Sequence, residues 1–208
     1  SSGYATAARE VDIAAGNTPV LSFGSRHIHP ALAPYMERAA YVGGVVGYSN
    51  IGAADAVPEE PSGTMPHALM LCFGKGNQEQ AWEAFNEAVD DDVPRIVLAD
   101  TYSDEVDEVL RAVDALGDDL DGVRLDTTGS RRGNFRDIIR EVRHELEQVG
   151  RGDVDIYVSG GIDADAAAEL RETVDGFGIG SAITNADPID FGLDIVEREG
   201  EPISKRGK

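Results

Sequence analysis

Short hydrophobic runs alternate along the chain with longer segments whose apolar positions recur every three or four residues. The short runs, rich in Val, Ile and Leu, predict strands at 18–23, 43–48, 95–99, 123–125, 154–158 and 176–179. The amphipathic segments predict helices at 31–40, 64–73, 78–89, 103–116, 135–148 and 163–173, a short helix at 51–57, and a helical or extended segment that ends at Gly16. A strand–helix unit repeated about six times is typical of a parallel sheet. We therefore expect an α/β fold, an irregular or incomplete (β/α) barrel, because a regular barrel has eight strands.

Single residues predict the beginnings of three helices and one feature of the core. Ser, Thr and Asp side chains accept hydrogen bonds from the exposed amides of a helix N-terminus, so we expect Thr64, Ser103 and Asp163 to cap the helices that follow them. Cys72 lies in the apolar run 68–73 and is expected to be a buried core thiol. As the one cysteine of the chain, it excludes an internal disulfide and a cysteine-based zinc site.

The chain is strongly acidic. Its 208 residues include 39 Asp and Glu against 18 Lys and Arg, a formal net charge of −21. Such a chain repels nucleic acid and anionic membranes, and it has neither a hydrophobic run of transmembrane length nor a signal peptide. We therefore expect a cytoplasmic protein without nucleic-acid or membrane partners. Because the acidic residues are spread along the whole chain, the composition resembles that of halophilic proteins, in which salt screens self-repulsion.

A cluster of arginines stands out against this acidic background. Seven of them fall between positions 124 and 151: Arg124, Arg131, Arg132, Arg136, Arg140, Arg143 and Arg151. Arginine binds phosphate or carboxylate through its bidentate fork, and the first three lie on a predicted strand and loop, so we favour a bound anion there. For the helical Arg136, Arg140 and Arg143 we favour a solvated face paired with the glutamates at 141, 145 and 147.

Residues suited to a ligand site follow nearly every predicted strand. They are Arg26, Asn50, Asp100, Asp126, the turn Ser159-Gly160-Gly161 and the turn Gly178-Ile179-Gly180-Ser181. The carboxyl ends of barrel strands meet on one face. Glycine turns after the last strands let backbone amides approach a phosphate, although tight turns alone remain the alternative. The two aspartates suit ribose hydroxyls or Mg²⁺ bound to a diphosphate, with helix capping as the alternative.

Several common motifs are missing. The chain has no GxGxxG dinucleotide fingerprint, no phosphate-binding P-loop and no HExxH metal motif. His27 and His29 lack a third ligand at a suitable spacing, so a metal chelated by them is not expected. The periodicity of the predicted helix gives His67 no more than a structural role.

Six sequence blocks together resemble the nicotinate phosphoribosyltransferase family, of the archaeal kind. The blocks are SFGSRHIHP (22–30), GTMPHAL (63–69), LADTY (98–102), VRLDTTGSRRGNF (123–135), VSGGIDADAAAELRE (158–172) and FGIGSAITNADPIDF (177–191). The resemblance implies a type II phosphoribosyltransferase-like barrel domain at 1–191 and a C-terminal strand and basic tail at 192–208. That tail is expected to return towards an N-terminal domain missing from this sequence, which begins without Met and so reads as a piece of a longer chain.

The resemblance also implies a reaction in NAD salvage. The family transfers phosphoribosyl from phosphoribosyl diphosphate (PRPP) to nicotinate, giving nicotinate mononucleotide and diphosphate, with Mg²⁺ and commonly with ATP as a co-substrate. Carried over by block, Phe23 stacks on the pyridine ring, Arg26 binds its carboxylate and the neutral Asn50 avoids repelling it. Arg124 and Asp126 hold diphosphate and ribose hydroxyls, Asp100 lies by the Mg²⁺, and His67 is the histidine that ATP phosphorylates. The phosphate cradle comprises Ser159, Gly160, Gly161, Gly178, Gly180 and Ser181.

Two other functions remain as alternatives. A quinolinate phosphoribosyltransferase ranks lower, because a dicarboxylate needs more basic residues and because that family lacks the GTMPH block. A phosphoribosyl-ligand binding domain without turnover fits an isolated barrel, since the family's active site is shared within a homodimer. One departure from the nicotinate family is His27, at a position where a second arginine is common.

Overall fold

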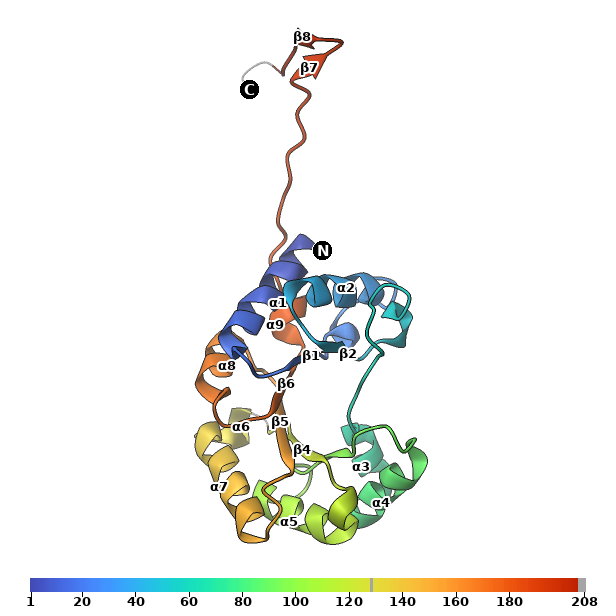
Figure 1. The fold of residues 1–208 in the computed structure, drawn as a ribbon, viewed down its shortest axis with the longest axis vertical. Helices are drawn as coiled ribbons and strands as arrows, with labels where there is room; N and C mark the ends of the chain where they lie inside the picture. The colour runs from blue at the N-terminus through green and yellow to red at the C-terminus, as the bar shows by residue number, and fades with distance from the viewer. Residues whose placement is uncertain (128, 206–208) are drawn as a thin grey trace.

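Six parallel strands form a sheet that curls into a half-barrel (Figure 1). The computed structural model describes residues 1–127 and 129–205, without the side chains of residues 131 and 132. The strands are β1 (Val20–Ser22), β2 (Gly47–Tyr48), β3 (Ile96–Leu98), β4 (Gly122–Leu125), β5 (Asp155–Ser159) and β6 (Gly176–Ile179). Their order is β2-β1-β6-β5-β4-β3. The predicted incomplete parallel barrel is confirmed.

Helices cover the outer side of this curled sheet (Figure 1). The longer ones are α1 (Ser2–Ala15), α2 (Ala33–Gly43), α3 (His67–Phe73), α4 (Gln78–Ala88), α5 (Glu105–Leu116), α7 (Phe135–Gln148) and α8 (Ala164–Leu170). Short turns of helix are η1 (Ser25–His27), η2 (Ile51–Ala53), η3 (Gly117–Asp119), α6 (Gly129–Arg132) and α9 (Ser181–Thr184). The helix predicted at 51–57 is thus only a short turn, and α6 lies in a segment predicted to be a loop.

The core lies between the sheet and the helices, as the sequence periodicity indicates. Strand residues such as Val123 and Ile156 are fully buried, which is typical of parallel strands covered on both faces. On α7 the buried positions Ile139, Val142 and Leu146 form the predicted apolar stripe. Burial of such side chains contributes about 1.5–3 kcal/mol each, so the stripe fixes α7 against the sheet.

The two edge strands are joined by the segment at 62–65 instead of by further strands. The amide of Ser62 donates to the carbonyl of Tyr48 at the end of β2 over 2.9 Å. Three residues later, the amide of Met65 donates to the carbonyl of Ile96 in β3 over 3.4 Å. Met65 is fully buried. An extended crossing therefore spans the two edges of the sheet and forms one wall of its open end.

This crossing explains why the predicted cap at Thr64 is wrong. The helix α3 begins at His67, and Pro66 precedes it in an extended conformation with a ψ of 147°. A residue before proline avoids the helical region, and Met65 is moreover paired with β3. The chain therefore cannot turn into a helix before Pro66.

The predicted N-cap of α5, Ser103, is wrong by one residue, and the predicted N-cap of α8, Asp163, is confirmed. Asp104 caps α5 and accepts from the amides of Val106 and Asp107, while the amide of Ser103 is bonded to Glu108 instead. Asp163 caps α8 through a bond of 2.9 Å from the amide of Ala166. At these two helices the side chain nearest the first free amides is the one that caps.

The C-terminal segment leaves the body of the domain (Figure 1). Its only regular structure among the described residues is a small hairpin of β7 (Glu197–Arg198) and β8 (Glu201–Pro202), so the strand predicted within 192–208 is limited to these two short pieces. Phe191 and Leu193 are 80% and 95% exposed. The return of this tail towards a second domain stays a prediction.

Cys72 is exposed on α3, so the prediction of a buried thiol is wrong. Its apolar neighbours suggested burial, but Leu71 is exposed as well, and only Met70 of this helix is buried. A short helix at the rim of the sheet has one narrow buried face. Within the described part of the chain, no helix is long and apolar enough to cross a membrane.

Candidate active site

A cavity of about 660 Å³ lies at the carboxyl ends of the strands. Its walls come from the ends of β1, β4, β5 and β6 and from the crossing between the edge strands. It is lined by Phe23, Ser25, Arg26, His27, Ser49, Gly63, Thr64, Pro66, His67, Ala68, Arg124, Asp126, Ser159, Gly160, Gly161, Gly178, Gly180 and Ser181. Most residues predicted from the sequence to bind a ligand are therefore brought together. Asn50 and Asp100 are not among the lining residues.

Arg124 lies on the floor of this cavity and is 7% exposed. Its Nη1 donates to Asp126 over 3.1 Å and to the hydroxyl of Ser159 over 2.7 Å, and its Nη2 donates to the carbonyl of Met65 over 3.1 Å. Burial lowers the pKa of Arg124 from its ordinary value, and the charge of Asp126 opposes that shift. Arg124 thus ties β4, β5 and the crossing together, and most of its donors are already engaged by the protein.

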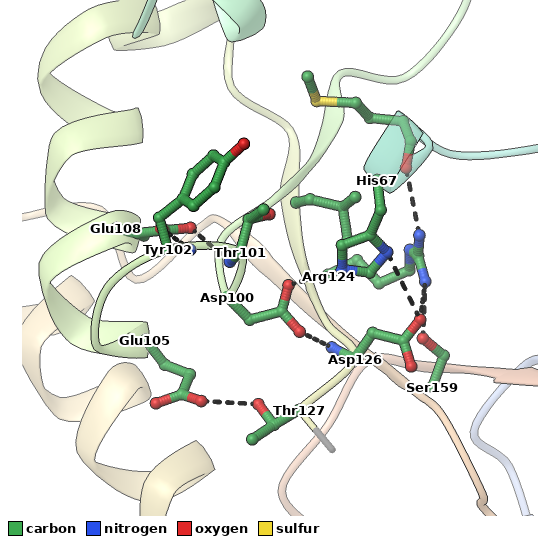
Figure 2. A network of polar contacts seen from close by, with 12 residues as sticks. His67, Asp100, Thr101, Tyr102, Glu105, Glu108, Arg124, Asp126, Thr127 and Ser159 are labelled. Atoms are coloured by element: carbon green, nitrogen blue, oxygen red, sulfur yellow. Dashed lines mark hydrogen bonds and ion pairs between the residues drawn. The ribbon is translucent and has the colours of Figure 1, made fainter. Parts of the chain in front are cut away.

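Asp126, at the end of β4, is the centre of a polar network (Figure 2). Its backbone amide donates to Oδ2 of Asp100 over 2.5 Å, and its carboxylate accepts from Arg124. His67 lies between the two carboxylates, with Nε2 at 3.2 Å from Oδ1 of Asp100 and Nδ1 at 3.9 Å from Oδ2 of Asp126. His67 therefore belongs to the site by geometry, which its helical periodicity did not indicate.

Two glutamates behind this network were missed in the sequence. Glu108, fully buried on α5, accepts from the amides of the turn that follows Asp100, and Glu105 accepts from the hydroxyl of Thr127 over 2.7 Å (Figure 2). Acidic residues in the first turn of a helix usually indicate an interaction with its dipole. The signal available in the sequence was their number, since Asp104, Glu105, Asp107 and Glu108 exceed what one helix N-terminus needs.

The glycine turns bring backbone close to side chains of the site. Gly160 and Gly161 have φ values of 81° and 67°, in the left-handed region that favours glycine. A Cβ at Gly160 would lie 2.1 Å from Oδ1 of Asp126, and one at Gly178 would lie 2.3 Å from the ring of Phe23. These positions therefore need glycine for space, whereas no atom of the described residues lies within 4 Å of a Cβ placed at Gly161.

Aromatic and cationic groups from the end of β1 face the glycine turns. The guanidinium of Arg124 lies 5.6 Å from the centre of the Phe23 ring, a cation–π distance. Arg26 and His27, on η1, are exposed and line the cavity. Burial and the neighbouring Arg26 lower the pKa of His27, so its ring favours the neutral form.

The buried carboxylate of Glu37 supports the turn that carries Arg26. Glu37 is fully buried on α2, and its Oε1 accepts from the hydroxyl of Ser25 over 2.5 Å. Its Oε2 has no hydrogen-bond partner among the described residues. Burial raises the pKa of Glu37, and the hydroxyls of Ser22 and Ser25 oppose this shift.

Other predicted site residues have different surroundings. The side chain of Asn50 accepts from the amide of Gly52 and so caps η2. On α7, Arg143 pairs with Asp175 and Arg140 approaches Asp137, so the predicted pairs with the glutamates at 141, 145 and 147 are wrong. Asp175 lies just before β6, so Arg143 has its acceptor outside its own helix, whereas Asp137 belongs to α7. The predicted anion ligands Arg131 and Arg132 lie outside the described side chains.

The described residues contain no group of three His, Cys, Asp or Glu arranged to hold a metal ion. Mg²⁺ commonly takes only one or two carboxylates from a protein and completes its shell with substrate phosphates and water. Asp126 lines the cavity, whereas both oxygens of Asp100 are engaged by Asp126 and His67. These side chains suit a metal that enters already bound to a diphosphate. Asp126 is better placed than Asp100 to contact it, because Asp126 lines the cavity.

A parallel half-barrel with carboxylates and glycine turns at the carboxyl ends of its strands places this chain among the α/β barrel-like folds, in which phosphate sites commonly lie at that end. Residues 4–194 match the sequence model of the family described as quinolinate phosphoribosyl transferase, C-terminal domain. The match covers most of the chain, and the chain belongs to this family.

Two solved structures and one relative matched by sequence are similar to this chain. The crystal structure of nicotinate-nucleotide pyrophosphorylase from Pyrococcus furiosus has a TM-score of 0.93 and 53% identity, covering 100% of this chain and 53% of that one. Nicotinate phosphoribosyltransferase pncB1 of Mycobacterium tuberculosis is 33% identical over 97% of this chain and 46% of its own length. The nicotinate-nucleotide pyrophosphorylase of Francisella tularensis, at 20% identity, has a TM-score of 0.59 over 89% of this chain and 57% of that one. The chain thus spans about half the length of these relatives.

These findings correct the predicted family and reaction. The resemblance to nicotinate phosphoribosyltransferase, with nicotinate as acceptor and ATP as co-substrate, is overturned by the family match and by the structure at 53% identity. Both favour the quinolinate phosphoribosyltransferase that the sequence leaves as an alternative. The preference for nicotinate over quinolinate rested on the number of basic residues and on the block at 63–67, whose structural task is to close the sheet beside β3. That task does not depend on the acceptor.

Proposed function

We propose that this chain is the barrel domain of a quinolinate phosphoribosyltransferase in NAD biosynthesis. The reaction transfers phosphoribosyl from PRPP to the ring nitrogen of quinolinate and releases diphosphate. The carboxylate beside that nitrogen then leaves as CO₂ and a proton takes its place on the ring carbon, giving nicotinate mononucleotide. A cytoplasmic location and a homodimer with shared active sites belong to the same proposal.

The observation that carries the proposal is the content of one cavity. It combines an exposed cation at the end of β1, a carboxylate at the end of β4 and glycine turns after β5 and β6, namely Arg26, Asp126, Gly160 and Gly180. PRPP and quinolinate together present a 5′-phosphate, a diphosphate, ribose hydroxyls and two carboxylates. The 5′-phosphate, the ribose hydroxyls and one carboxylate each have a complement within the same 660 Å³.

The residues would divide the substrates between them. The amides of the glycine turns suit the 5′-phosphate, because backbone N–H groups can approach it where no side chain intervenes. Asp126 accepts hydrogen bonds from ribose hydroxyls. Arg26 forms a bidentate pair with a carboxylate of the acceptor, and the ring of Phe23 offers an apolar face to the pyridine.

The chemistry needs charge stabilisation and positioning more than a protein nucleophile. As the bond from C1′ to diphosphate breaks and the bond from the ring nitrogen forms, positive charge develops on the ribose. The carboxylate of Asp126 is held by Arg124, whose guanidinium also donates to Ser159, so it is fixed before the reaction and needs no reorganisation. Holding the ring nitrogen in line with C1′ removes an entropic part of the barrier. Mg²⁺ bound to the diphosphate would neutralise the charge of the leaving group, with Asp126 beside it.

A direct assay tests the proposal. The full-length protein is incubated with PRPP and Mg²⁺ and with either quinolinate or nicotinate, with and without ATP. We expect nicotinate mononucleotide from quinolinate, with equal amounts of diphosphate and CO₂ and with a rate that ATP does not change. Turnover of nicotinate alone, or turnover that requires ATP, would overturn the acceptor. Binding of PRPP without product from either acid would instead identify a binding domain without turnover.

A further inference from the structure

We propose that Glu108 is a positioning residue for the site: from the outer helix α5 it fixes the turn after Asp100 and thereby sets the position of Asp126. Of the measurements that test this proposal, only the change in kcat rests on the proposed function. Glu108 does not line the cavity, so it has no contact with a ligand there.

Glu108 is surrounded by donors from the strand–helix turn. Its Oε1 accepts from the amides of Tyr102 and Ser103 over 2.7 and 2.8 Å, and its Oε2 accepts from the amide of Thr101 over 2.8 Å. Gln78 donates a longer bond of 3.3 Å to Oε1. Hydrogen bonds to an ionised carboxylate are stronger than neutral ones. Three consecutive amides are thus held by one fully buried side chain.

This carboxylate is not needed to cap its own helix. Asp104 already accepts from the amides of Val106 and Asp107 at the N-terminus of α5. Glu108 lies one turn further along and directs its oxygens away from the helix to the turn at 101–103. These bonds therefore stabilise the conformation of the turn.

The turn leads directly to the site. Asp100 immediately precedes the three held amides, and its own oxygens contact the amide of Asp126 at 2.5 Å and the ring of His67 at 3.2 Å. A rotation of the turn would displace Asp100, and Asp126 would lose the bond to its amide. Glu105 accepts from the hydroxyl of Thr127, the residue that follows Asp126 after β4. The first turn of α5 therefore supports the loops that follow both β3 and β4 (Figure 2).

The test compares Glu108→Gln with a matched remote variant. In Glu108→Gln the amide group keeps one acceptor oxygen and turns an NH₂ donor towards backbone amides, so the turn cannot keep all its bonds. Asp175→Asn is the control, because Asp175 also accepts from a backbone amide, that of Ile156 over 2.7 Å, but at the other end of β5. Both variants lose a bond to a buried or half-buried carboxylate, so both are expected to lower the melting temperature.

The decisive measurement is the amide resonance of Asp126 in the full-length protein, read by NMR. We expect it to move in Glu108→Gln and to stay in place in Asp175→Asn, and we expect kcat to fall by up to about 100-fold in the first variant alone, the loss typical of misplaced catalytic groups. An unmoved Asp126 amide with unchanged kcat, in a variant as destabilised as Asp175→Asn, would overturn the proposal. If Glu108→Gln does not fold, Glu108→Asp, which keeps the charge and shortens the reach, gives the same readout. Absence of transfer by the wild-type protein would refute the proposed function, while the resonance of Asp126 would still report whether Glu108 positions it.

Discussion

The carboxylate of Asp100 accepts a hydrogen bond of 2.5 Å from the backbone amide of Asp126. The bond joins the ends of two neighbouring strands at the place where both leave the sheet. Through this bond Asp100 fixes the backbone position of Asp126 at the edge of the cavity. Asp100 thus acts on the site mainly through the backbone of Asp126, and less as a group exposed to a ligand.

Replacing Asp100 by alanine should therefore damage both stability and transfer. The amide of Asp126 would be left without its acceptor, which costs about 1–3 kcal/mol when the group is buried. Asp104→Ala is the control, since it removes the cap of α5 at a cost of about 1 kcal/mol without touching Asp126. Melting curves and transfer rates of both variants check this. Equal effects on the rate would contradict a special role for Asp100.

Two adjacent glycines give a sharper comparison. Both have positive φ values, so Gly160→Ala and Gly161→Ala carry a similar backbone strain of roughly 1 kcal/mol. Only the first places a Cβ against the carboxylate of Asp126, 2.1 Å from Oδ1. We expect Gly160→Ala to weaken PRPP binding well beyond Gly161→Ala, as measured by isothermal calorimetry. Similar affinities of the two variants would show that the contact with Asp126 does not matter.

Arg26 should govern binding of the aromatic acid and not of PRPP. A charge-assisted bidentate pair contributes about 1.5–3 kcal/mol, so Arg26→Ala should raise the KM for quinolinate by roughly 10- to 150-fold. Arg26→Lys should restore only part, because an ammonium lacks the planar fork. Arg38→Ala removes the same charge from a helix face outside the cavity and should change neither KM. Equal losses for both substrates in Arg26→Ala would assign Arg26 to the phosphates or to the fold.

Glu37 should make the protein less stable as the pH rises. Burial raises the pKa of its carboxyl in the folded state, so the unfolded chain ionises first, near pH 4.3 for a free glutamate. The cost of burying the charge is absent below that pH and fully present above the folded pKa. Glu37→Gln should raise the melting temperature at pH 8 and leave it unchanged near pH 3.5, because the amide carries no charge to bury and the carboxyl is already neutral at the lower pH. A lower melting temperature at pH 8 would contradict this account.

The net charge of −21 should make stability depend on salt. Raising KCl from about 0.1 M to about 1 M shortens the Debye length from about 10 Å to about 3 Å and screens repulsion between surface carboxylates. We expect the melting temperature to rise over this range, and to rise little when sucrose replaces KCl at matched osmolality. A melting temperature that is flat or falls with KCl would reject adaptation to high salt.

Local patterns were enough to predict the sheet and much of the cavity. The strand at 176–179 and the cap at Asp163 follow from apolar runs and from helix-terminus chemistry, which act over a few residues. Arg26, Asp126 and Gly160 come together because all of them follow parallel strands, whose carboxyl ends share one edge.

The remainder depends on contacts between distant segments. In the sequence, Glu108 looks like an ordinary solvent-exposed residue of an acidic helix. Only the fold shows that it accepts hydrogen bonds from three backbone amides. The start of α3 was misjudged because Met65 pairs with Ile96 across the open edge of the sheet. The acceptor was misjudged for a related reason: a residue block that closes a barrel is informative about architecture and says little about a substituent on a pyridine ring.

The position of β1 between β2 and β6 has a consequence for the order in which the domain is made. In this sheet Val20 lies opposite Phe177, so β1 finds its second neighbour only after β6 has been synthesised. Strands β3, β4 and β5 pair with neighbours in sequence and can associate earlier. Contacts between segments far apart in the chain form slowly and leave strand edges exposed in the meantime. The cavity takes walls from both groups of strands, so it exists only once the last contacts have formed, and a ligand bound there selects molecules that have completed folding.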